Sequence, residues 1–357
     1  MIPGRCRGGP WVLGANALLL VLLFAEARLV PMAGAGVSGL APDAGFSLRG
    51  IWSGDIVLIA TGLLFLGLGF LLPLHAGLLN LAIHGEFLAG FVVGSLLSRS
   101  TDLVPSAQAG LGLLAGALAG GLTGLVVAWL KRKFAIHEIL SGLLLGAAMI
   151  PVAHAFGAAP TAPPSLTIPL GSLAERIPWG PSLHLHPSFV LAWGILLLVL
   201  GIVFAFLTSR MLRTSVRGFE LRQVGANPLA AVASGVDVDG VQTTVMAIGG
   251  ACAGLTGALQ LWTNPAAALA RWPFPIGFAG LTVALVGGGY LRGAVLTAAL
   301  LAMWLGLPGI RAALETPLWA ALTALLLVLP IVWILPRQEP DQGAPRAIWR
   351  TRHREPL

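Results

Sequence analysis

Long apolar segments alternate with short polar segments along most of this chain. The apolar runs extend over about 18 to 24 residues, and a helix of about 20 apolar residues crosses the hydrocarbon core of a bilayer. Because lipid offers no hydrogen-bond partners, a backbone that crosses it must satisfy its own N–H and C=O groups, as a helix does. The pattern therefore predicts an all-α, polytopic integral membrane protein with about ten transmembrane helices, at about residues 11–31, 52–73, 86–98, 107–130, 138–157, 188–208, 240–262, 276–290, 293–309 and 316–336.

The lysine and arginine residues predict the orientation, since the cytoplasmic loops of membrane proteins carry an excess of both. With the N-terminus in the cytoplasm, 15 of the 21 Lys and Arg residues fall on the inner side and 6 on the outer side. An even number of helices also returns the basic tail, residues 337–357, to the cytoplasm. We therefore expect a single transmembrane domain over residues 1–357, with both termini cytoplasmic and the lipid bilayer around it.

The first helix has an alternative interpretation. Ala25-Glu26-Ala27 resembles a signal-peptidase site behind an apolar stretch. An uncleaved first helix fits the distribution of charged residues better.

Composition excludes several classes of function. Hydrophobic residues make up 57% of the chain and charged residues 10%, whereas soluble domains are about 25% charged. The net charge of +7 lies in a few loops, as membrane topology requires, so no nucleic acid partner is expected. The chain has only two lysines, Lys131 and Lys133, and no Gly-x-x-x-x-Gly-Lys phosphate loop. We expect no enzyme activity, no catalytic residues and no cofactor, so that any ATP hydrolysis takes place on a separate subunit.

The cysteines and histidines predict no metal site. Cys6 and Cys252 lie at the N-terminus and inside a predicted helix, so a disulfide between them is not expected either. His184 and His186 fall in an outer loop without a nearby Cys or acidic pair. Glu138, which opens the fifth predicted helix, is interpreted as a helix-start signal because an acid in the first turn suits the helix dipole.

Glycines recur every four residues in two of the predicted helices. A spacing of four places them on one face, where a neighbouring backbone can approach closely, and such faces pack membrane helices together. We expect helix packing at Gly112, Gly116, Gly120 and Gly124, and again at Gly250 and Gly254.

The predicted inner loop 209–239 contains strong signals for local structure. Asn227 can cap a helix and Pro228 suits its first position. Gly235 is a natural stop, so a two-turn helix is expected between them. A second helical stretch is expected from Gly218 to Val224, ending at Gly225. From these residues alone, a surface for a partner protein and a purely structural loop are both open.

A polar group lies between the second and third predicted helices. Asn80, His84 and Glu86 occur among apolar residues, where polar side chains are expensive unless they face a cavity or each other. Because Asn80 and His84 are four residues apart, we expect them on one helix face. They either border a solvent-filled translocation path, which a neutral His84 would suit to a neutral, hydroxyl-rich solute, or form a packed polar turn.

Several blocks of the sequence resemble the permease subunits of bacterial ABC importers for simple sugars and nucleosides, a family that shares its membrane fold with ribose and branched-chain amino acid permeases. The resemblance covers about residues 55–310. Its strongest block is similar to the family's cytoplasmic motif and consists of Thr214, Gly218, Phe219, Leu221, Arg222, Val224, Gly225, Asn227, Pro228, Ala230, Ala231 and Gly235. Similar blocks occur at 77–90, 247–258 and 277–287.

The resemblance has departures. Gln223 stands where the family has Ala, Ala82 where it has Gly, His84 where it has Glu, and Glu86 where it has Gln. The segment 289–293 also replaces an Asn-Pro-x-Gly block of the family.

The resemblance implies a function, a location and partners. The chain would be a permease subunit in the bacterial inner membrane that forms the path for a simple sugar or nucleoside. In the family the cytoplasmic loop docks on an ATPase, which implies a coupling role for Thr214, Gly218, Phe219, Arg222, Gly225, Asn227, Pro228 and Gly235. The implied partners are two ATP-binding cassette ATPase subunits, a second related permease subunit and an extracytoplasmic substrate-binding lipoprotein. A branched-chain amino acid ABC permease, an ATPase-independent secondary transporter and a non-transporting scaffold are the alternatives.

Overall fold

The computed structural model describes residues 54–100, 104–155, 187–260 and 277–306. Within these ranges all regular structure is helical, in agreement with the predicted all-α class. The helices are α2 (Gly54–His75), α3 (Ile83–Ser100), α4 (Pro105–Phe134), α5 (Glu138–Ala155), α7 (Pro187–Thr214), α8 (Val216–Ala226), α9 (Pro228–Ala233), α10 (Val238–Leu259), α12 (Gly277–Val286) and α13 (Leu291–Gly306).

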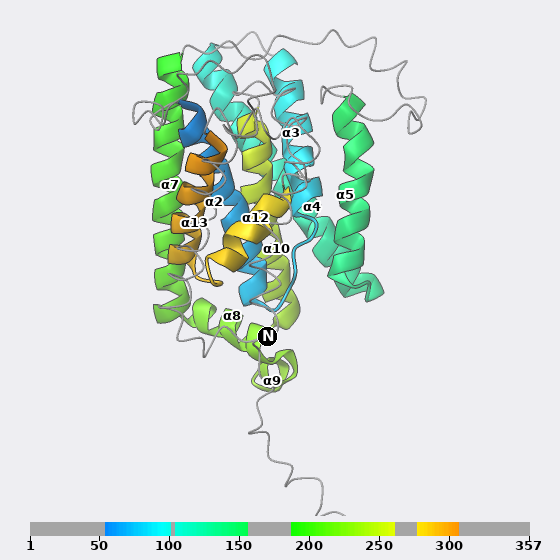
Figure 1. Ribbon diagram of the computed structural model, residues 1–357. Helices are drawn as coiled ribbons and strands as arrows, with labels where there is room; N and C mark the ends of the chain where they lie inside the picture. Colours follow the sequence, from blue (N-terminus) through cyan, green and yellow to red (C-terminus); the bar gives the residue numbers. More distant parts are fainter. Residues whose placement is uncertain (1–53, 101–103, 156–186, 261–276, 307–357) are drawn as a thin grey trace, which may run out of the picture.

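Most of these helices run roughly side by side as a bundle, with α2 inside it and α7 and α5 toward opposite sides (Figure 1). α2 packs against α7, α10, α12 and α13, while α3 lies between α4, α5 and α10. α8 and α9 lie together beyond one end of the bundle (Figure 1). The C-terminal ends of α2 and α4 and the N-terminal end of α10 lie on this same side of the bundle.

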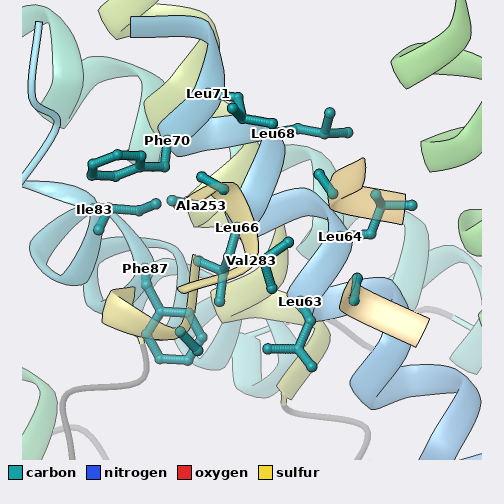
Figure 2. Packing of buried hydrophobic residues seen from close by; sticks show 14 of the residues in the cluster. Leu63, Leu64, Leu66, Leu68, Phe70, Leu71, Ile83, Phe87, Ala253 and Val283 are labelled. Carbon is teal, nitrogen blue, oxygen red and sulfur yellow. The ribbon is translucent and has the colours of Figure 1, made fainter. Parts of the chain in front are cut away.

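The centre of the bundle is apolar. Figure 2 shows Phe70 and Leu66 of α2 close to Phe87 of α3, Ala253 of α10 and Val283 of α12. All five side chains are at most 1% exposed. The long apolar side chains of α2 therefore fill the space between helices that are far apart in the sequence.

Three of the described helices are long and apolar enough to cross a membrane, over Ile56–His75, Ser106–Phe134 and Phe189–Thr214. The outer faces of the latter two leave large apolar side chains uncovered, such as Leu118 at 69% and Leu196 at 56% exposure. An apolar surface of this kind suits a lipid environment. The number of membrane crossings and the orientation remain predictions.

The second to ninth predicted helices each correspond to a described helix, and their boundaries differ at particular places. α3 begins at Ile83 rather than near 86, and α12 ends at Val286 rather than near 290. The early end of α12 has a local cause, because Gly288 and Gly289 have φ values of +69° and +73° that a continuing helix cannot accommodate. The first and tenth predicted helices, His184, His186 and Cys6 lie outside the described residues.

The glycine faces of α4 and α10 meet each other, as their spacing predicts. A Cβ at Gly120 would overlap the carbonyl oxygen of Gly250, and one at Gly254 would overlap that of Gly116. Gly124 likewise meets the backbone of Met246. Gly112 is the exception, since no described residue lies within 4 Å of the position of its Cβ.

This contact predicts a stability difference between two Gly→Ala variants in the bundle. Gly254→Ala places a methyl group against the Gly116 carbonyl and forces α4 and α10 apart, and such overpacking costs about 1–3 kcal/mol. Gly112→Ala is the matched control because its methyl group meets none of the described residues. Thermal unfolding of the purified variants in detergent should show a loss for Gly254→Ala alone. Equal unfolding temperatures for the two variants would contradict the packing.

Candidate functional site

α8 follows α7 after a single residue, Ser215. The Ser215 hydroxyl accepts a hydrogen bond from the Gly218 backbone N–H at 3.0 Å, which caps the start of α8. A Cβ at Gly218 would overlap the carbonyl oxygen of Met211, so α8 lies directly against the end of α7. Thr214, the last residue of α7, donates its hydroxyl proton to the Arg210 carbonyl at 2.9 Å.

α9 has the boundaries that its sequence predicts. Asn227 Oδ1 accepts hydrogen bonds from the N–H groups of Leu229 at 3.1 Å and Ala230 at 3.2 Å, and Pro228 opens the helix. Gly235 has a φ of +83°, which only glycine adopts without strain, and it ends the turn after α9. The predicted cap, first residue and stop are confirmed.

α8 and α9 together have an inner and an outer face. The inner face is buried in the bundle core through Leu221, Val224 and Ala231. The outer face leaves apolar side chains uncovered, with Val216 74%, Phe219 51%, Leu229 82% and Val232 61% exposed. Arg217 and Arg222 of α8 are also exposed, as is Arg213 in the last turn of α7. The outer face therefore combines apolar and basic groups, a composition suited to a protein partner with acidic groups.

The prediction that Gly225 ends its helical stretch is wrong. Gly225 lies inside α8, which continues to Ala226. Its role is close packing, because a Cβ there would overlap the carbonyl oxygen of His75 and would lie 3.3 Å from the Gly77 backbone nitrogen. α8 thus touches the end of α2 backbone to backbone. The sequence alone does not distinguish a glycine that allows a neighbouring backbone to approach from a glycine that ends a helix.

The end of α2 contains a proline that leaves one carbonyl without its usual partner. Pro73 has no N–H, so it cannot donate to the carbonyl of Gly69 four residues earlier. Asn80 Nδ2 lies 3.5 Å from this carbonyl oxygen and donates to it. The sequence feature behind this contact is a proline inside an apolar helix followed by a lone asparagine.

Asn80 also binds Glu86. Asn80 Nδ2 donates to Glu86 Oε2 at 2.9 Å, and both residues are 0% exposed. Glu86 Oε1 lies close to the positions where Cβ atoms of Gly124 and Gly250 would be, at 3.0 and 3.1 Å. The carboxyl group therefore sits beside the crossing of α4 and α10. Among the described residues, no lysine or arginine forms an ion pair with it.

His84 lies near this pair but does not share its contacts. Asn80 belongs to the connection before α3, whereas His84 is in the first turn of α3. The expectation that both lie on one helix face is therefore wrong. The His84 ring stacks on Phe87 with 6.4 Å between ring centroids, and Gly277 of α12 packs against its backbone. Asn80 and Glu86 contact each other, and His84 does not join them.

A family model described as the permease component of branched-chain amino acid transport systems matches residues 54–333. This match covers well over half of the 357 residues. The chain belongs to this family of transport permeases. Together with the long apolar helices, membership identifies a multi-pass membrane protein.

Three curated relatives are similar to the permease. The guanosine ABC transporter permease protein NupP of Bacillus subtilis is 29% identical over 74% of this chain and 78% of its own length. The glucose ABC transporter permease protein TsgB13 of Haloferax volcanii is 29% identical over 65% of this chain and 63% of its own length, just under two thirds. The nucleoside ABC transporter permease protein NupB of Lactococcus lactis is 26% identical over 69% and 70%. No solved structure matches the chain significantly.

The permease also has a cluster of charged residues whose contacts with one another were not predicted from the sequence. Lys131 near the end of α4 lies 3.1 Å from Glu138, and Arg132 lies 4.0 Å from Asp239 in the first turn of α10. Glu138 is the first residue of α5, so its predicted role as a helix start is confirmed. The sequence does contain a signal for this cluster, namely a run of basic residues at the end of one helix followed by an acidic residue at the start of the next.

The Asn80–Glu86 contact predicts opposite results for two substitutions of the acid. In Glu86→Gln the amide oxygen can still accept from Asn80, and no charge remains in a site without a basic partner, so stability should be equal or higher. Glu86→Ala removes the acceptor and should cost about 1–3 kcal/mol. Thermal unfolding in detergent measures both. Equal losses for Gln and Ala would show that the hydrogen bond contributes nothing.

Proposed function

We propose that the permease is the membrane subunit of an ABC-type importer that moves a simple sugar or a nucleoside across the bacterial inner membrane. The observation that carries this proposal is the outer face of α8 and α9. Two capped helices, packed rigidly on the bundle, expose four large apolar side chains beside three arginines. The similarity to three ABC transporter permeases supports the same assignment.

The coupling role belongs to the segment from Thr214 to Gly235. Its glycines and caps hold α8 and α9 in place, so that a force on their outer face moves the bundle rather than the loop. Phe219 is half exposed and supplies apolar contact with the ATPase. Arg222 is exposed and is placed to pair with an acidic side chain of the ATPase.

The proposed assembly contains two ATP-binding cassette ATPase subunits, a second permease subunit of related sequence and an extracytoplasmic substrate-binding lipoprotein. ATP hydrolysis takes place on the ATPases. The permease contributes about ten helices as a single domain with both termini in the cytoplasm.

Asn80, His84 and Glu86 are proposed to shape the translocation path. In the described conformation the first and last of these are fully buried. Each of the three residues has a buried polar atom without a partner among the described residues, namely Asn80 Oδ1, His84 Nδ1 and Glu86 Oε1. Such atoms are expensive to keep dry, so we propose that they meet water or solute in another state of the transport cycle.

Competition between solutes tests the substrate class. Cells that express the transporter should take up tritiated guanosine or labelled glucose, and an excess of the same unlabelled solute should reduce that uptake. The three relatives are named for glucose, guanosine and nucleosides, whereas the family description names branched-chain amino acids. Leucine should therefore not compete. Uptake of leucine that depends on this permease would favour the amino acid alternative.

Topology and docking are tested together by a single cysteine. Ala226 is the last residue of α8 and is exposed. In a chain without Cys6 and Cys252, Ala226→Cys should crosslink to the ATPase. A membrane-impermeant maleimide should label it in inside-out vesicles and not in intact cells. Labelling from outside the cell would overturn the orientation and the coupling role.

The outer face of α9 predicts the effect of a charge on ATPase binding. Leu229 is 82% exposed, so Leu229→Asp leaves the bundle intact but places a charge in the proposed apolar contact. Retention of the ATPase during purification should fall about tenfold, the loss of about 1.4 kcal/mol. Val104→Asp is the control, because Val104 is 65% exposed at the opposite end of α4 from Lys131. Full retention by Leu229→Asp would exclude this face as the docking surface.

A further inference from the structure

We propose that the α2–α3 turn, residues 76–82, transmits movement of the coupling helices to the buried polar pair Asn80–Glu86. Gly225 of α8 and Asn80 of the turn are the positioning residues at the two ends of this route. The proposal rests on the docking of an ATPase on α8 and α9. It adds the route by which that docking reaches the interior of the bundle.

The first step of the route is the contact between α8 and the turn. Gly225 meets the carbonyl of His75 and the backbone of Gly77, with no room for a side chain between them. Val224, beside Gly225, is 0% exposed and belongs to the bundle core. A displacement of α8 toward the bundle therefore presses backbone on backbone, where no flexible side chain can absorb it.

The second step is the stiffness of the turn. Gly77 N–H donates to the Leu74 carbonyl at 3.0 Å, and Leu78 N–H donates to the Pro73 carbonyl at 3.0 Å. With Gly77 at a φ of +77°, these bonds form the motif that commonly closes a helix at a glycine. Ala76 and Leu78 are 0% and 1% exposed, so packing fixes the turn as well.

The third step is the link from the turn to the helices around it. Asn80 joins the turn to the free carbonyl of Gly69 in α2 and to Glu86 in α3. Glu86 in turn lies beside the crossing of α4 and α10. On the other side, a Cβ at Gly142 of α5 would lie 2.6 Å from the Ala82 nitrogen. With α8, six helices therefore contact this turn or the pair that it positions.

The alternative is that the turn is only a structural wedge. A wedge would affect the stability of the bundle but not the response of the bundle to nucleotide. The two accounts differ in whether a change at Asn80, which is 0% exposed and not part of the docking face, abolishes a nucleotide-dependent movement. Such a movement can be measured without knowing the substrate.

The experiment uses the whole complex of permease and ATPase in nanodiscs. Nitroxide labels are attached to Leu96→Cys on α3 and Leu200→Cys on α7 in a chain with Cys6→Ser and Cys252→Ala, since both labelled positions are exposed. Double electron–electron resonance spectroscopy measures the distance between the two labels, first without nucleotide and then with ATP plus vanadate. In the labelled chain without a further substitution, which serves as the background, the distance between the labels should change by about 2–5 Å, the range of helix movements in switching proteins.

Two variants test the two ends of the route. Asn80→Ala removes the link to Gly69 and Glu86 and leaves the docking face unchanged. Gly225→Ala forces α8 away from His75 and leaves the polar pair unchanged. Asn80→Ala should still retain the ATPase, and each variant that assembles with the ATPase should lose most of the shift. Gly112→Ala, whose methyl group contacts no residue that the structure describes, should keep the full shift.

The results separate this proposal from the proposed function. If the unmodified permease retains no ATPase, the proposed function itself fails. If the ATPase is retained and the background shows no shift, or if either variant retains the ATPase and keeps the full shift, transmission through the turn is wrong. If one variant does not assemble, the other decides, because the two substitutions have no contact in common.

Discussion

Close approach of helix backbones is the constraint on which the rest of this structure depends. Lipid tails are as apolar as leucine, so membrane helices associate through tight packing rather than through the hydrophobic effect. α10 uses this kind of packing toward two of its neighbours, α3 and α4. Cβ atoms at Gly250, Gly254 and Gly257 would overlap carbonyl oxygens of Gly120, Gly116 and Phe87, respectively. Without these glycines α3 and α4 could not lie where they do, and Glu86 would not be enclosed between them.

The same kind of contact ties the proposed coupling helices to the bundle. α8 meets α7 at Gly218 and the end of α2 at Gly225, in each case at a backbone carbonyl. A proline in α2 then creates the unpaired carbonyl that Asn80 uses. Glycine and proline, which usually mark ends of helices, here decide which helices touch and where a polar group can be buried.

Much of this arrangement could be predicted from the sequence, and the parts that could not have physical reasons. Asn227, Pro228 and Gly235 act within a few residues of each other, so the sequence was sufficient to predict α9. Gly225 was misinterpreted because a glycine that ends a helix and one that admits a distant backbone look alike in sequence. The Asn80–Glu86 contact depends on the path of a connection between helices, which periodicity does not predict. His84 was grouped with them by spacing, although α3 begins only at Ile83.

ATP-driven uptake is the most direct test of the central claim that α8 and α9 couple this permease to a separate ATPase. The permease would be reconstituted with its ATPase and binding protein in proteoliposomes, and uptake of tritiated guanosine would be followed with ATP on the side of α8 and α9. The account predicts uptake that requires ATP and stops when the ATPase is omitted or its phosphate-loop lysine is replaced. Uptake at an unchanged rate without a working ATPase would contradict it and would identify a secondary transporter.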